Sequence, residues 1–442
     1  MTAVTLRPPE TVMRLDRLGC AHPNRLSFLR QLLRRVAAER WRFDCTAWAI
    51  DAIGVGHAVY RLCTPERSYS LVAFSHDLPD HLRSDRVIAT AWDATFALYD
   101  GDPTPADIER LAANVPLQEA GRVTARELSL SRANRSERLF EAVIAALAAG
   151  QQPTADLLDS VGYLMRTTAV YGSGKFGAAD RSRIAARNEL AAPFQVEMLA
   201  VWLIRTFTID LVEHLARQRG GAAATALDPA LRRRLGVGNS TGLGMAPFLI
   251  RHPLLLNNWI LARERALQAV RSLPAADPAA VAGFIDALAA ARDNAARWQS
   301  GHPRQIRQLA DLRGDLDRID AALPDWRWDA AQPWNRWWRW GEASLSIEGQ
   351  EALLALLLEP HGALIDHLGD GMRADEDAVG LIDGAMPVSR LQSLLHTRYR
   401  WALPIDYSQP DACARFWYVS EEKLEPRLGE RHREPGALIQ RA

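Results

Sequence analysis

Residues 194–217 form the segment that most restricts the fold, because their sequence is apolar on most sides of a helix. Such a helix must be covered by other parts of the chain. Its most apolar part, residues 198–212, is shorter than a membrane span and contains Arg205 and Asp210, so we expect a buried helix and no membrane-spanning segment. A chain of 442 residues, 48% of them hydrophobic, is long enough to cover it within two or three domains.

The charged side chains of this helix need partners, since an unpaired buried charge is costly. Asp210 and His214 are one turn apart and can form a carboxylate–imidazole pair that acts in catalysis. Arg205 can hold the carboxylate of a substrate. The alternative for these three residues is structural, with Arg205 in a salt bridge to a neighbouring helix.

The N-terminal part of the chain has the pattern of an α+β domain. An amphipathic helix over residues 24–41 precedes four short runs rich in β-branched and aromatic residues, at 43–51, 57–63, 69–74 and 86–100. Runs at this spacing predict a small antiparallel sheet with helices against one face. We therefore predict an α+β N-terminal domain over residues 1–118.

The remaining residues, 119–442, are predicted to form a large helical domain, which makes the fold class α+β and predominantly α-helical. Helical periodicity predicts helices over residues 124–149, 154–170, 179–189, 193–217, 227–235, 247–271, 276–299, 303–322 and 347–369. Near the C-terminus, residues 415–420 have the composition of a strand that returns to the N-terminal sheet.

Composition argues against several classes of function. The formal net charge is zero, so nothing draws the whole chain to nucleic acid or to an anionic membrane. The four cysteines are far apart and include no CxxC pair, and the N-terminus lacks a signal-peptide pattern. We therefore expect a cytoplasmic protein, and its heavy use of alanine and arginine is typical of a GC-rich bacterium.

Lysine is rare in this chain. The 53 basic residues are 51 arginines and two lysines, Lys175 and Lys423. A lysine retained under such a bias can mark a place where arginine cannot serve, because lysine loses its proton or attacks a carbonyl near neutral pH when buried. This scarcity makes Lys175 a candidate catalytic residue.

Lys175 lies in the glycine-rich segment 172–177, where flanking glycines let the backbone present both Ser173 and the lysine. Tyr171 is a candidate proton donor, and Arg166, predicted at the end of a helix, is a candidate ligand for a substrate carboxylate. The alternative is a C-capping glycine followed by an exposed lysine.

A second glycine-rich segment, residues 236–244, surrounds Asn239, Ser240 and Thr241 with four glycines. Its hydroxyl groups and backbone N–H groups can bind a carboxylate or phosphate. No strand is predicted before it, the P-loop lysine is absent and the glycine spacing differs from that of dinucleotide sites, so we predict no nucleotide and no other cofactor. The sequence leaves open whether the two glycine-rich segments meet in space or are only turns.

Arg132 and Arg135, predicted three residues apart on one helix, can converge on a carboxylate or phosphate, with acidic side chains of the protein as the alternative. His361 and His367 lie in a polar cluster over residues 359–370. Their spacing matches no known metal-binding motif, so we assign no metal ligands, although the sequence leaves metal binding there open.

Residues 326–340 contain six of the fourteen tryptophans, interleaved with arginines. Packing of a helix is the favoured interpretation, and a ligand site or an oligomer interface is the alternative.

These features lead to one hypothesis and one competitor. The hypothesis is a nucleotide-independent enzyme, lyase- or transferase-like, that acts on a small anionic organic substrate by acid/base or lysine-assisted carbonyl chemistry. The competitor is a non-enzymatic ligand-binding or assembly protein that uses residues 326–340 as its interface. Nucleic-acid and membrane partners are not expected, and formation of a homo-oligomer is left open.

Overall fold

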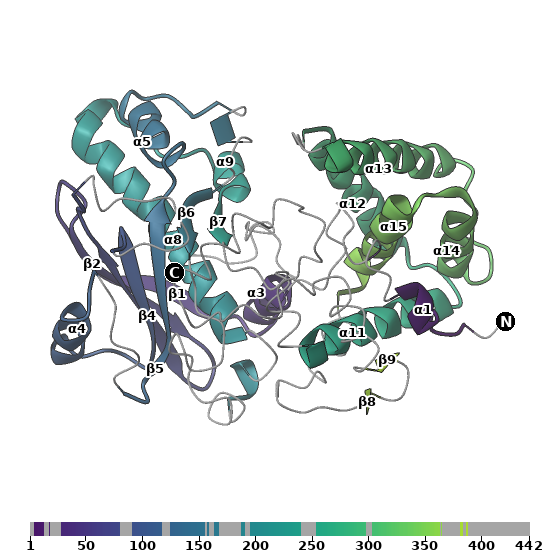
Figure 1. Cartoon of the computed structure of the whole chain (residues 1–442), viewed down its shortest axis with the longest axis horizontal. Helices are drawn as coiled ribbons and strands as arrows, with labels where there is room; N and C mark the ends of the chain where they lie inside the picture. Colours follow the sequence, from purple (N-terminus) through teal and green to yellow (C-terminus); the bar gives the residue numbers. More distant parts are fainter. Residues whose placement is uncertain are drawn as a thin grey trace. The chain divides into compact units, whose positions relative to one another are not determined.

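The structure is a computed structural model of the whole chain (Figure 1). It describes residues 4–12, 17, 28–79, 91–116, 124–154, 157–158, 163–167, 187–190, 195–239, 253–297, 303–362, 364, 381–382 and 386–387. The chain divides into two compact units. The helical unit comprises Met1–Leu26 and Leu243–Leu428, and the sheet unit comprises Ser27–Gly242 and Gly429–Ala442. The predicted domain boundary at residue 118 therefore falls within the sheet unit.

The sheet unit is built on a seven-stranded sheet in which the strands follow one another in chain order. Its strands are β1 (Arg42–Ile50), β2 (Gly56–Cys63), β3 (Ser68–Ser75), β4 (Ala94–Asp100), β5 (Glu127–Arg135), β6 (Tyr163–Thr167) and β7 (Gly236–Asn239). Neighbouring strands are antiparallel except β6 and β7, which are parallel. The α+β class and the antiparallel sheet in the N-terminal part are confirmed.

Two of the predicted helices, over residues 124–149 and 154–170, are wrong in part, because β5 and β6 occupy them. Only Phe140–Ala148 of the first is helical, as α5. The β5 sequence alternates leucine with serine over residues 128–131, which is the period of a strand, and nearly all of its side chains are buried. Burial on both faces overrode the helical pattern that arginine and alanine suggested.

The two faces of the sheet carry different helices (Figure 1). One face packs against α8 (Gln195–Gly220), where the rings of Phe96 and Phe207 are 5.6 Å apart. The other face packs against α4 (Pro105–Ala112), where Leu111 joins Val72, Ala97 and Leu130 in a hydrophobic cluster. We call these the α8 face and the α4 face. Helix α3 (Phe28–Ala38) also packs against α8, which is buried along most of its length as its sequence predicted.

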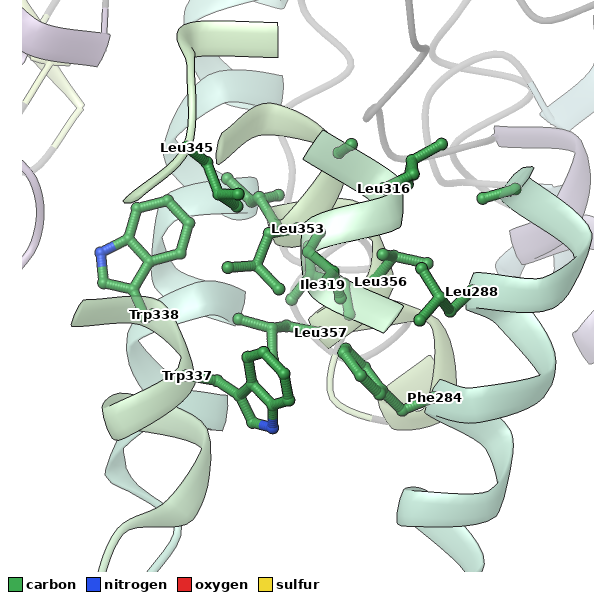
Figure 2. Packing of buried hydrophobic residues seen from close by; sticks show 14 of the residues in the cluster. Phe284, Leu288, Leu316, Ile319, Trp337, Trp338, Leu345, Leu353, Leu356 and Leu357 are labelled. Carbon is green, nitrogen blue, oxygen red and sulfur yellow. The ribbon is translucent and has the colours of Figure 1, made fainter. Parts of the chain in front are cut away.

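The helical unit is formed by α1 (Pro9–Val12), α11 (Pro253–Ser272), α12 (Pro278–Arg297), α13 (Pro303–Ala322), α14 (Pro333–Ser344) and α15 (Ile347–Leu358), followed by the short η4 (Glu359–His361). The residue pairs Leu381–Ile382 (β8) and Met386–Pro387 (β9) form a separate antiparallel ladder. In Figure 2, Leu353 and Leu357 of α15 lie in the middle of the core. Trp337 lies on one side of them and Phe284 on the other.

The N-terminal segment is held in the helical unit by a buried ion network. Arg7 donates two hydrogen bonds to Glu264, at 2.8 and 2.6 Å, and one to Glu351 at 3.0 Å. Arg17 donates to Glu351 at 2.8 Å. All four residues are buried, so the segment is part of the core of this unit.

The arginines around Glu351 keep this glutamate charged. Burial would raise the pKa of Glu351, but the positive charges of Arg7, Arg263 and Arg17 lower it to about 2. Removing one partner would leave an uncompensated charge in the interior.

None of the helices in the described part of the chain combines the length and the apolarity needed to cross a bilayer. The predicted strand over residues 415–420 lies outside the described residues.

Candidate functional site

The strand register brings the ends of β6 and β7 together. Thr167 of β6 is paired with Ala133 of β5 on one side and with Asn239 of β7 on the other. Because β6 and β7 are parallel, the chain leaves both strands at the same end of the sheet. The chain therefore leaves the sheet toward residues 172–177 and toward residues 240–244 from two paired residues, Thr167 and Asn239.

Two arginines lie on one face of the sheet beside this point. Asn134 of β5 pairs directly with Arg166 of β6, and Arg132 is two residues from Asn134, so the three side chains share the α4 face. Diagonal neighbours of this kind are about 7–8 Å apart, which is within reach of two long side chains. We call these residues the Arg132/Arg166 site.

The predicted convergence of Arg132 and Arg135 is wrong. Residues three apart in a strand point to opposite faces, so Arg135 lies on the α8 face. Its Cζ atom is 4.8 Å from the centre of the Phe140 ring, and its backbone N–H donates to Asp93 at 2.9 Å. The predicted pairing of these two arginines depended on helical spacing, and this part of the chain is a strand.

Around the Arg132/Arg166 site the α4 face is polar and aromatic. The guanidinium of Arg132 lies over the Trp92 ring, 4.6 Å from its centre, and burial lowers the pKa of this arginine. Arg166 donates to the hydroxyl of Tyr163 at 2.6 Å. Both arginines are partly exposed. Two cationic forks, an amide and a tyrosine hydroxyl are groups that can hold and orient an oxyanion.

His76 follows Ser75, the last residue of β3, which is level with Thr167 through the pairs Ser75–Ala94, Ala94–Ala133 and Ala133–Thr167. Its Nε2 atom is 3.2 Å from the Thr95 hydroxyl, and Thr95 is paired with Arg132 across β4 and β5. Burial, together with the charge of Arg135, lowers the pKa of His76 to about 4. The imidazole is therefore uncharged at neutral pH, with one nitrogen that donates a hydrogen bond and one that accepts.

The β7 strand carries the first two glycines of the second segment. Gly238 is paired with Arg166 and Gly236 with Tyr163. The side chains at these register positions are hydrogen atoms, so β7 adds no bulk beside either residue. Helix α9 (Pro229–Arg234) precedes β7, as predicted, and the glycine-rich segment itself begins as a strand, which the sequence did not predict.

Arg205 of α8 contacts the backbone just before β7. Its Nε donates to the carbonyl of Leu235 at 2.7 Å, and its Nη2 donates to the carbonyl of Arg232. It is buried, and these contacts hold the end of α9 where β7 begins. They are contacts with backbone carbonyls, whereas the sequence suggested a substrate carboxylate, so Arg205 positions the strand.

The predicted pair of Asp210 and His214 is not formed. The hydroxyl of Tyr60 donates to Asp210 at 2.8 Å, and Arg232 lies 3.7 Å from the same carboxylate. The Nε2 atom of His214 is 2.8 Å from the carbonyl oxygen of Asp51. Each residue connects α8 to another element, which is a structural role.

Several predicted site residues lie outside the described residues: Tyr171, Ser173, Lys175, Ser240 and Thr241. Asn239 is described as part of β7, although its side chain is not. For these residues the structure shows only that the chain leaves the sheet toward them from Thr167 and Asn239, which are paired.

The tryptophans of residues 326–340 lie largely in the interior. Trp334, Trp337 and Trp338 are 0%, 0% and 1% exposed and belong to the core of the helical unit. Trp326 stacks on Trp337 with ring centres 4.0 Å apart. An interface built on this segment would have to use its exposed arginines instead.

The polar cluster near His361 is described only in part. His361 Nδ1 lies 2.8 Å from the carbonyl oxygen of Leu357, and burial lowers the pKa of the ring. His367 lies outside the described residues. Across the ranges that the structure does describe, no group of three or more His, Cys, Asp or Glu side chains is arranged to hold a metal ion.

Comparison with other proteins assigns this chain to no family. No family model, no curated protein and no solved structure matches this chain. The functional interpretation therefore depends on the residues themselves.

Sequence reasoning missed four residues of this region, Trp92, Thr95, His76 and Tyr163. The alternation of leucine and serine in β5 was the available signal. It would have placed Arg132 with Asn134 instead of Arg135. The pairing of β5 with β4 and β6 depends on long-range contacts that no local pattern contains.

Proposed function

We propose that this chain is an enzyme that acts on a small anionic organic substrate at the Arg132/Arg166 site. The observation that carries the proposal is the position of two guanidinium groups on one sheet face, beside the common end of β6 and β7. Arginine binds carboxylate and phosphate groups through two parallel hydrogen bonds.

The proposed chemistry uses Lys175. Its neutral amine adds to a carbonyl carbon of the substrate, and loss of water gives an imine. Tyr171 donates the proton to the departing oxygen, and Ser173 lies beside the lysine in the chain. Lys175 is eight residues from Thr167, so its segment is long enough to extend over the neighbouring arginines. A lyase- or transferase-like reaction follows from an imine more readily than hydrolysis does.

The second glycine-rich segment has a supporting role in the proposal. Asn239, Ser240 and Thr241 bind another anionic group of the substrate through hydroxyl, amide and backbone donors. We place this activity in the cytoplasm, with a small molecule as the partner and without nucleic acid, because the chain has no net charge and its sequence contains no CxxC pair. Formation of a homo-oligomer is compatible with the proposal and is measured by native mass spectrometry.

The arginine part of the proposal is tested by binding. Isothermal titration with pyruvate, 2-oxoglutarate and inorganic phosphate should detect at least one ligand. Arg132→Gln and Arg166→Gln should each weaken that ligand about tenfold, the usual effect of losing a charge-assisted hydrogen bond. Arg217→Gln is the matched control, since Arg217 is exposed on α8. Equal affinities in all four proteins would overturn the site.

The lysine part is tested by chemical trapping. Reduction with borohydride in the presence of the same oxo acids should attach the substrate to Lys175, located by peptide mass spectrometry. Lys423 is the internal control, as the second of the two lysines in the chain. Label on Lys423 alone, or no label with any oxo acid, would contradict imine formation at Lys175. The binding test of the two arginines is independent of this result.

A further inference from the structure

A second pair of arginines lies in the helical unit, at the junction of α11 and α14. Arg271 is in the last turn of α11 and is partly buried, and Arg339 is exposed on α14. The two helices pack against each other. Arg339 belongs to the segment 326–340, whose tryptophans lie in the core, and Arg271 contacts this segment from α11.

Arg271 is held in place by neutral groups. Its Nε donates to the Asn335 side-chain oxygen at 3.0 Å, and its Cζ atom is 5.7 Å from the centre of the Trp338 ring. Asn335 and Trp338 are both buried. These contacts fix the orientation of the guanidinium and involve only its Nε atom and its flat face, so its two terminal nitrogens are directed elsewhere.

Other positive charges lie close by. Arg7 lies over the same Trp338 ring, with its Cζ atom 5.0 Å from the ring centre. Burial lowers the pKa of Arg271, and the charges of Arg7 and Arg339 lower it further against the opposing effect of Glu342 and Glu264. A cation placed in this way gains from an added negative charge more than a solvated surface arginine does.

The geometry of α14 places the remaining groups on one side. Residues 335, 339 and 342 are spaced by one helical turn, so Asn335, Arg339 and Glu342 share a face toward Arg271. Among the residues that the structure describes, no carboxylate lies within ion-pair distance of Arg271 or Arg339. Glu342 attracts Arg271 from farther away and competes with any anion bound there.

We propose that Arg271 and Arg339, oriented by Asn335, bind the oxyanion of a small phosphate- or carboxylate-bearing ligand at the junction of α11 and α14. This site is independent of the Arg132/Arg166 site and lies in the other unit. The fork of each guanidinium fits two oxygen atoms of one such group.

The test is titration calorimetry on the full chain that carries Arg132→Gln and Arg166→Gln, which removes the contribution of the sheet unit. The probes are inorganic phosphate and succinate. Arg339→Gln should weaken the bound probe about tenfold, and Arg271→Gln should do the same. Glu342→Gln should tighten binding, because it removes the competing charge. Arg307→Gln, an exposed arginine on α13, should change nothing.

The outcomes separate the alternatives. Binding of phosphate alone identifies a phosphate site, and binding of succinate alone identifies a carboxylate site. Arg271→Gln also removes the contacts with Asn335 and Trp338, so the thermal unfolding of this variant is recorded. If the variant is unfolded, the test depends on the variants at the exposed residues Arg339 and Glu342. No heat with either probe, or affinities unchanged by both Arg339→Gln and Glu342→Gln, would overturn the proposal whether or not the sheet unit binds its own ligand.

Discussion

The two units of this protein bury arginine in opposite ways. In the helical unit, burial alone would lower the pKa of Arg7, but Glu264 and Glu351 raise it well above its usual value. In the sheet unit, burial lowers the pKa of Arg132. The first arginine is stabilised as a cation by buried carboxylates, whereas the environment of the second disfavours its charge.

This difference separates a structural arginine from one suited to a ligand. A buried ion pair is satisfied inside the fold, and breaking it exposes the interior to an uncompensated charge. A partly desolvated cation near the end of two strands gains when an anion arrives, and perturbed groups of this kind gather at functional sites. The comparison predicts different responses to the same type of substitution.

The largest effect is expected in the helical unit. Glu351→Gln leaves Arg7 and Arg17 without their shared carboxylate, which should destabilise this unit by about 3–5 kcal/mol, the range for breaking a buried pair. Hydrogen exchange of the α15 amides, measured by mass spectrometry, should report the loss. Glu342→Gln, at an exposed position, should change the stability by less than about 0.5 kcal/mol. Similar exchange rates in both variants would show that the network is not structural.

Acid should weaken the two units in sequence. The pKa of His76 is about 4 in the folded protein against 6.5 ordinarily, so its contribution to stability is present above pH 6.5 and is lost as the pH falls toward 4. The pKa of Glu351 is about 2 against 4.5, so its contribution is lost between pH 4.5 and 2. Calorimetry at pH 7, 5 and 3 should show the sheet unit weakening first.

His76→Gln provides the control for this order. It should remove the loss between pH 6.5 and 4 and leave the loss at lower pH unchanged. If the variant retains the full loss above pH 4, another group controls the acid response of the sheet unit.

A small change in stability is expected for Arg132→Gln. Burial already disfavours the charge of Arg132, so its removal should alter the free energy of unfolding by less than about 1 kcal/mol. Arg7→Gln, by contrast, leaves the buried carboxylates of Glu264 and Glu351 without this partner and should lower the free energy of unfolding by about 3–5 kcal/mol. Chemical unfolding of the two variants measures the contrast directly, and equal losses would erase the distinction between the units.

The sequence predicted those parts of the fold whose local pattern agrees with their final environment. The apolar residues of α8 required burial, and the aromatic and β-branched runs of β1 to β4 formed the expected strands. It failed at β5, which is buried on both faces, and at β6 and β7, which are short. Their conformation is set by pairing with distant strands, which a local pattern does not encode.

The sequence named two residues of the candidate site but did not group them. Arg132 and Arg166 were both proposed as anion ligands, and the structure brings them to one face. Arg135 was joined to Arg132 because helical spacing was assumed, although the parity of a strand separates them. Arg205 was expected to need a partner, yet nothing in the sequence indicates that this partner is the backbone at the start of β7.

The central claim is that Arg132 and Arg166 hold the same anion, and a double-mutant cycle on affinity tests it most directly. The titrations use whichever probe the wild type binds, in a chain where Arg271→Gln and Arg339→Gln have removed the proposed second site. If both arginines hold one group, the double variant should lose much less than the roughly hundredfold expected from two independent tenfold losses. Losses that multiply fully, or affinities that do not change, would contradict a shared site.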